Sequence, residues 1–168
     1  HDADHHEKFP AELWKHSSDL GLNYYALPES FGGVASEKNI ISNILIAENL
    51  AQGDFSLTAG LLSTFSVINA ITQWGSESIQ NKYLSSISED SGIQATFAIQ
   101  EATPAFNPFQ LKTKVTNSNG QFTLQGEKTL VVLGETADLI LVNAEYNGKP
   151  DLFIVKRDST IRFKKSPS

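Results

Sequence analysis

Side chains that could bind a metal ion lie together at the start of the chain. They are His1, Asp2, Asp4, His5 and His6. Their spacing matches no established ligand pattern, and adjacent residues do not face each other on a helix. A solvated terminus explains this cluster better than a metal centre does, so we predict no metal site.

Groups suited to acid–base or nucleophilic chemistry also lack the right context. Glu12 and His16 are four residues apart, a spacing typical of an exposed helical pair. The hydroxyls within residues 63–66 fall in an apolar helical pattern without a G-x-S-x-G motif, so a nucleophile is not expected. Gly32-Gly33 has no following Lys-Ser or Lys-Thr, which argues against a phosphate loop. No G-x-G-x-x-G occurs, so a dinucleotide would not be held in the Rossmann manner.

Composition excludes several classes of function. The chain has 168 residues and a net charge of -6, which gives little electrostatic support for nucleic-acid binding. It has no cysteine, so disulfides and thiolate chemistry are excluded. The apolar stretch Leu57–Ile71 is broken by polar residues and predicts a buried helix, not a membrane span. Methionine is also absent, and we expect the chain to be part of a longer protein.

The first half of the chain has apolar residues at helical spacing and clear helix boundaries. We predict helices at about residues 10–20, 37–52, 55–74 and 77–88. Gly21 suits a left-handed stop after the first helix. The side chains of Ser36, Asp54 and Ser76 suit the N-caps of the other three.

The hydrophobic period changes near Asp90, and the second half of the chain indicates strands. Asn119-Gly120 and Asn147-Gly148 are strong hairpin signals. The expected strands are Ile93–Ile99, Leu111–Thr116, Gln121–Leu124, Ile140–Glu145, Leu152–Val155 and Thr160–Phe163. The predicted fold class is therefore α+β, with an N-terminal α-helical domain at residues 1–90 and an incomplete antiparallel β domain at residues 91–168.

Four stretches in the first half resemble, in order and spacing, the opening of the acyl-CoA dehydrogenase family. They are Phe9-Pro10-Ala11-Glu12-Leu13-Trp14, Leu27-Pro28-Glu29-Ser30-Phe31-Gly32-Gly33, Ala47-Glu48-Asn49-Leu50-Ala51-Gln52-Gly53-Asp54 and Trp74-Gly75-Ser76-Glu77. The resemblance implies FAD as the cofactor and an acyl-CoA-type substrate that is oxidised at its α,β bond. It also implies that the full-length protein is a homo-oligomer in the cytoplasm.

A later stretch resembles the family's first flavin motif, F-A-L-T-E-P-x-A-G-S-D, which Phe97, Ile99 and Glu101 match. Gln100 stands in place of the threonine that meets the pyrimidine edge of the flavin. Phe106 stands in place of the serine beside the pyrophosphate. The resemblance implies that residues 97–100 meet FAD mainly through main-chain groups and that Phe106 lies beside the pyrophosphate.

The second flavin motif of the family reads W-I-T, and Leu130, Val131 and Val132 stand in those places. By resemblance, Leu130 and Val132 would lie against the flavin ring. Valine cannot donate the hydrogen bond of the family's threonine, a loss of roughly 1 kcal/mol. We expect weaker FAD binding than in relatives that keep both hydroxyls.

No catalytic residue is assigned. In the family the catalytic base is a glutamate of a C-terminal helical domain, which we expect beyond the end of this chain, so these residues alone are not expected to be catalytic. Two alternatives stay open. A flavin-dependent monooxygenase of the same fold would suit the altered flavin edge, and the lost flavin side chains favour a non-catalytic homologue that acts as a partner or scaffold.

Overall fold

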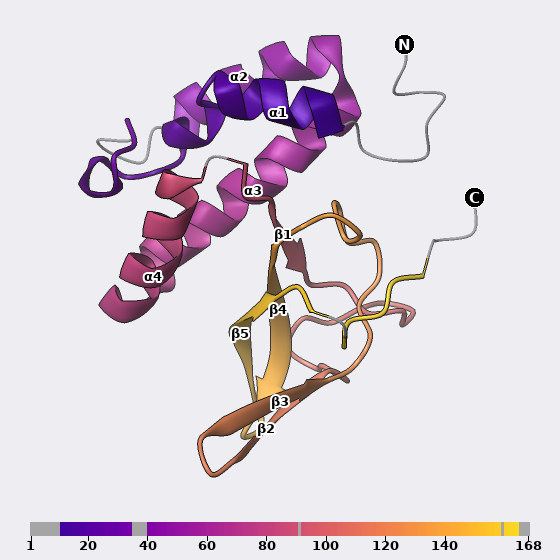
Figure 1. Ribbon diagram of the computed structural model, residues 1–168. Helices are drawn as coiled ribbons and strands as arrows, with labels where there is room; N and C mark the ends of the chain where they lie inside the picture. The colour runs from indigo at the N-terminus through magenta and orange to yellow at the C-terminus, as the bar shows by residue number, and fades with distance from the viewer. Residues whose placement is uncertain (1–10, 35–39, 91, 159, 165–168) are drawn as a thin grey trace. The chain divides into compact units, whose positions relative to one another are not determined.

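The computed structural model describes residues 11–34, 40–90, 92–158 and 160–164. The chain forms two compact units, residues 1–94 and residues 95–168 (Figure 1). The first is helical and the second is built on a sheet. The expected domain boundary after residue 90 stays a prediction.

The described residues of the helical unit form four α-helices and two short 3-10 helices. They are α1 (Ala11–Asp19), η2 (Leu22–Tyr25), η3 (Glu29–Phe31), α2 (Ile40–Gly53), α3 (Phe55–Trp74) and α4 (Glu77–Glu89). The helices expected from the sequence are confirmed wherever the structure describes them. The predicted cap Ser36 and the opening Phe9-Pro10 lie outside the described residues.

Helix boundaries follow the predicted signals. Gly21 has a φ of 69°, the left-handed conformation that suits a glycine after a helix. The Asp54 carboxylate accepts a hydrogen bond of 2.8 Å from the Leu57 N–H at the start of α3. The Ser76 hydroxyl oxygen accepts one of 3.4 Å from the Ile79 N–H at the start of α4. These caps satisfy donors that the first turn of a helix leaves unpaired.

Helix α3 supplies much of the core of the helical unit. Its buried apolar side chains include Leu61, Phe65 and Ile68, and α4 adds Leu84 and Ile87. Among the described helices, α3 alone has the length and composition to cross a membrane, and 50% of its most apolar window is buried. That burial is the pattern of a core helix in a globular protein.

In the part of the second unit that the structure describes, five strands form one sheet. They are β1 (Ala95–Ala98), β2 (Lys114–Ser118), β3 (Gln121–Gln125), β4 (Leu139–Tyr146) and β5 (Lys149–Lys156). Strand β4 is central, because β5 pairs with all of it while β1 pairs with residues 139–142 and β2 with Glu145. The face formed by Ala98, Ile140 and Val142 packs with Ala137 into a buried cluster.

The two predicted hairpins are confirmed, but the prediction of an antiparallel sheet is wrong in part. β2–β3 and β4–β5 are antiparallel and turn at Asn119-Gly120 and Asn147-Gly148, all four residues having positive φ. β1 and β2 both pair with β4 in parallel, so the sheet is mixed. A hairpin has a local turn signal, whereas a parallel pair joins strands that are distant in sequence.

The expected strand at Thr160–Phe163 does not form. Residues 161–164 are outside any strand, and Asp158 turns the chain there by accepting hydrogen bonds from the N–H and hydroxyl of Thr160. A carboxylate that binds its own backbone two residues on makes such a turn. No helix occurs in the described residues after Glu89, as the sequence predicted.

Candidate functional site

The structure brings the two predicted flavin motifs together. We call residues 96–101 the strand-end segment, because they comprise most of β1 and the three residues after it, and residues 128–132 the loop segment, which lies between β3 and β4. The Thr96 hydroxyl donates to the Val132 carbonyl at 2.6 Å. The Thr129 N–H donates to the Gln100 carbonyl at 2.8 Å. Residues separated by about thirty positions therefore lie side by side.

Three of the predicted site residues present their side chains to solvent. Gln100 is exposed, and Leu130 and Val132 are 70% and 44% exposed. Phe97 and Ile99, which precede Gln100 in the strand-end segment, are half-buried. Exposed apolar side chains on a segment that is joined through its backbone to Gln100 are suited to covering a flat, weakly polar ring.

The backbone of the loop around the loop segment is strained. Leu130 has a φ of 54° and Leu133 a φ of 56°, a left-handed conformation that costs about 1 to 3 kcal/mol for a residue other than glycine. Two turn hydrogen bonds hold this backbone in place. The Gly134 N–H donates to the Val131 carbonyl at 3.1 Å, and the Thr136 N–H donates to the Leu133 carbonyl at 2.9 Å. Strain of this kind gathers at ligand sites.

Phe106 is the predicted residue that the structure does not join to the others. It is half-buried and follows Ala105, whose φ is 51°. In the described part of the chain, no hydrogen bond or ring contact links Phe106 to the strand-end or loop segment. Its predicted place beside a pyrophosphate stays a prediction.

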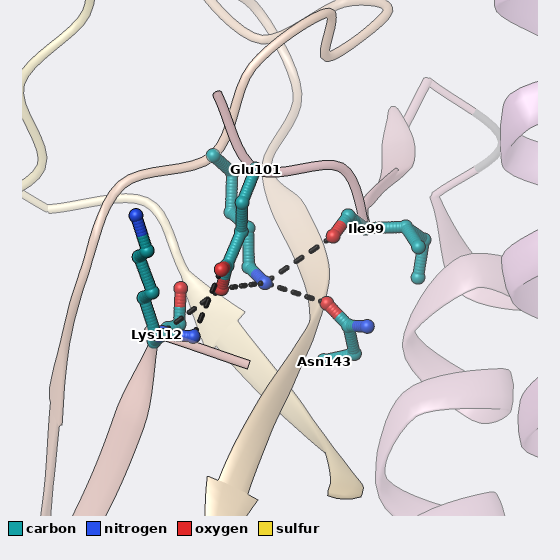
Figure 2. A network of polar contacts seen from close by, with 6 residues as sticks. Ile99, Glu101, Lys112 and Asn143 are labelled. Atoms are coloured by element: carbon teal, nitrogen blue, oxygen red, sulfur yellow. Dashed lines mark hydrogen bonds and ion pairs between the residues drawn. The ribbon is translucent and has the colours of Figure 1, made fainter. Parts of the chain in front are cut away.

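A buried ion pair lies between the two segments. The Lys128 ammonium is 3.0 Å from Glu101 Oε1, and the two side chains are only 8% and 4% exposed. The same ammonium donates to the Ile99 carbonyl at 3.2 Å and to Asn143 Oδ1 at 2.6 Å. Figure 2 shows these acceptors converging on one nitrogen. An ammonium has three N–H groups, and each has an acceptor here.

Backbone amides hold the carboxylate of this pair from the other side. Glu101 Oε2 accepts from the Lys112 N–H at 2.8 Å and Oε1 from the Thr113 N–H at 2.9 Å, as Figure 2 shows in part. Gly126 allows the chain after β3 to lie close to Thr113, because a Cβ at this position would lie 2.6 Å from the Thr113 Cα. The network thus ties both segments to the start of β2 and, through Asn143, to β4.

The electrostatics of the pair follow from burial and hydrogen bonding. Burial by itself raises the pKa of Glu101, but the Lys112 and Thr113 amides and the Lys128 ammonium outweigh it and lower the pKa to about 2. Burial lowers the pKa of Lys128 below its ordinary value, and Glu101 opposes that shift. Glu101 is therefore a carboxylate anion at neutral pH, and such a group is a poor proton acceptor.

Sequence reasoning missed this pair as a functional element. Glu101 matched the first flavin motif, but Lys128 is 27 positions away, and no local spacing rule links residues at that distance. A glutamate in the first motif and a lysine shortly before the apolar residues 130–132 were the signals available in the sequence.

Comparison with known proteins defines the class. The family model described as acyl-CoA dehydrogenase, N-terminal domain, matches residues 1–90. That match spans more than half of the chain, and the chain belongs to the acyl-CoA dehydrogenase family, as its motifs predicted.

Particular relatives agree with this assignment. The short-chain-specific acyl-CoA dehydrogenase of Megasphaera elsdenii is 30% identical over 148 residues, which cover 85% of this chain and 38% of that protein. Butyryl-CoA dehydrogenase from the same organism has a solved structure with a TM-score of 0.77 and 26% identity, over 88% of this chain and 40% of that one. An acyl-CoA dehydrogenase from Bacillus anthracis, solved in complex with FAD, has a TM-score of 0.75 and 27% identity, over 88% and 25%. The chain spans less than half the length of these relatives.

Proposed function

We propose that the protein is an FAD-dependent acyl-CoA dehydrogenase, which oxidises the α,β bond of an acyl thioester. The observation that carries this proposal is the pairing of the two motif segments through the Thr96–Val132 and Thr129–Gln100 hydrogen bonds. In a member of this family, that pairing would bring an amide side chain and two exposed apolar side chains to one surface. Such a surface fits a flavin ring better than it fits a charged ligand.

Each site residue has a distinct part in holding FAD. Backbone groups of residues 97–100 and the Gln100 amide would meet the polar edge of the ring, and Leu130 and Val132 would cover its apolar part. Phe106 offers no donor to a pyrophosphate, so that end would depend on main-chain N–H groups. When bound, FAD would supply the acceptor for the hydride that leaves the β carbon.

The base that removes the α proton is assigned to none of the described residues. Glu101 is the buried carboxylate nearest the proposed flavin surface in sequence, but three donors from Lys112, Thr113 and Lys128 already occupy it. Its low pKa makes proton abstraction unfavourable. Glu101 would therefore keep its charge and position through the reaction.

A spectrum tests the proposal directly. The protein expressed from its complete gene should show flavin absorption after purification or after addition of FAD. Butyryl-CoA, added without oxygen, should bleach that absorption, because the substrate reduces the flavin. Protein that takes up no FAD would contradict the proposal and favour the non-catalytic homologue. Bound flavin that acyl-CoA leaves oxidised would also contradict it.

We also propose that the complete protein is a cytoplasmic homo-oligomer that takes an acyl-CoA substrate. The described helical unit supports association, because it exposes large apolar side chains such as Leu20, Phe55 and Trp74, and exposed apolar surface commonly marks an interface. Light scattering after size exclusion would measure the mass in solution. A monomer at micromolar concentration would contradict the proposed homo-oligomer.

A further inference from the structure

The ion pair of Glu101 and Lys128 stands between two segments, and this placement suggests more than a contribution to stability. Lys128 belongs to the loop segment, yet its ammonium binds the Ile99 carbonyl and the Glu101 carboxylate of the strand-end segment. One side chain thereby sets the distance between the two halves of the candidate flavin surface.

Hydrogen bonds also anchor the pair to the sheet. The Glu101 carboxylate accepts hydrogen bonds from the backbone N–H groups of Lys112 and Thr113, the two residues that precede β2. Asn143, in the middle of β4, accepts from Lys128 at 2.6 Å. A carboxylate and an ammonium held by several partners in a dry site have little freedom to move.

From these contacts we infer that Glu101 and Lys128 are positioning residues, which place Gln100 opposite Leu130 and Val132 so that the flavin ring fits between main chain and side chains. This inference rests on the proposed function. Neither residue would touch the ring. They act through Ile99 and Gln100 on one side and through the turn at Leu130 on the other.

The alternative is a purely structural ion pair, and the sheet offers one for comparison. Lys114 and Glu145 are 3.2 Å apart between β2 and β4, and both side chains are more exposed than those of the buried pair. This second pair joins β2 to β4 in the same sheet and touches neither motif segment. It is therefore a matched control for loss of a lysine from the sheet unit.

The test compares variants of the protein expressed from its complete gene. Lys128→Met should weaken FAD binding by on the order of tenfold to 100-fold, because small displacements of positioning groups carry effects of that size. It should also shift the absorption maximum and the midpoint potential of the bound flavin. Lys128→Arg, which keeps the charge, should restore part of the affinity. Lys114→Met should match the wild type in all three measurements.

Asn143→Ala keeps the inference testable if Lys128→Met fails to fold. It removes one acceptor of the ammonium without changing either segment, and it should move affinity and potential in the same direction by less. Circular dichroism and thermal unfolding report whether each variant is folded.

Several outcomes would overturn the inference. A folded Lys128→Met variant with wild-type affinity, spectrum and potential would do so, even if its melting temperature fell. Loss of the fold in Lys128→Met, Lys128→Arg and Asn143→Ala alike would make the network a stability element only. Wild-type protein that binds no FAD would refute the proposed function as well, whereas wild-type binding with unaltered variants would refute only the positioning role.

Discussion

Glu101 keeps its charge although almost no solvent reaches it. The free energy of unfolding should therefore change with pH in the acid range. Its folded pKa of about 2 lies below the ordinary 4.5, so the unfolded chain binds the proton more tightly. The stabilisation is complete above pH 4.5 and is lost as pH falls toward 2. A shift of this size corresponds to about 3 kcal/mol.

Urea unfolding across that pH window measures the effect. The free energy of unfolding of the wild type should fall steeply toward acid, and that of Glu101→Gln should fall less. Glu145→Gln removes a more exposed carboxylate from the same sheet and should keep most of the wild-type slope. A wild-type curve as shallow as that of Glu101→Gln would contradict the assignment of the low pKa.

At the same scale, two substitutions should strengthen the proposed cofactor site. Gln100→Thr and Val132→Thr would return the hydroxyls of the family motifs at positions that are already exposed. Each hydrogen bond gained is worth on the order of 1 kcal/mol, or about fivefold in the dissociation constant for FAD. Fluorescence titration of the full protein measures it, with the exposed Val34→Thr as the control. An unchanged or weaker affinity in the double variant would show that these positions do not meet the flavin.

The motifs predicted that two distant segments form the candidate surface, but not which side chains hold the segments together. Residues 97–100 and Leu130 with Val132 could be read from the two motifs, and the structure places those segments together. The role of Glu101 and Lys128 could not be predicted from the sequence. Their contact depends on how β1, β2 and the loop segment converge, which no local pattern records.

At the scale of elements, Gly126 decides how closely the chain after β3 can approach Thr113. A Cβ at this position would lie 2.6 Å from the Thr113 Cα and 2.5 Å from its Oγ1. Gly126→Ala should therefore destabilise the sheet unit by about 1 to 3 kcal/mol and loosen the Lys128–Glu101 contact.

Gly53→Ala is the control for this prediction, because a Cβ at the end of α2 meets nothing within 4 Å. Alanine is also the better helix former, so no loss is expected there. Chemical denaturation of both variants gives the comparison. Equal stability of Gly126→Ala and the wild type would show that the chain accommodates a methyl group beside Thr113.

Local signals predicted the helices and hairpins but not the order of strands in the sheet. Asp54, Ser76 and the two Asn-Gly turns act over a few residues, and each one holds in the structure. The parallel pairing of Ala95–Ala98 with residues 139–142 has no local marker. The alternating residues 160–163 read as a strand because the turn made by Asp158 was not recognised.

At the scale of the whole molecule, apolar exposure leads to a prediction about residues 1–168 expressed alone. Large apolar side chains are exposed in the helical unit, Leu20, Phe55 and Trp74 among them. We expect this polypeptide to bind a hydrophobic dye and to unfold gradually, because surface of this kind is normally covered. Dye fluorescence and a thermal scan test it. A sharp, cooperative transition in a monomer would contradict the prediction.

The parallel pairing of β1 with β4 has a consequence for synthesis on the ribosome. Strand β1 ends at Ala98, and its partner begins at Leu139, so the partner is translated about 40 residues later. At roughly 5 to 20 residues per second, β1 waits about 2 to 8 seconds without its neighbour. During that interval the β2–β3 hairpin can close by itself, since hairpins form in microseconds. The nascent chain therefore exposes an unpaired apolar strand for seconds, which is long enough for a chaperone to bind it.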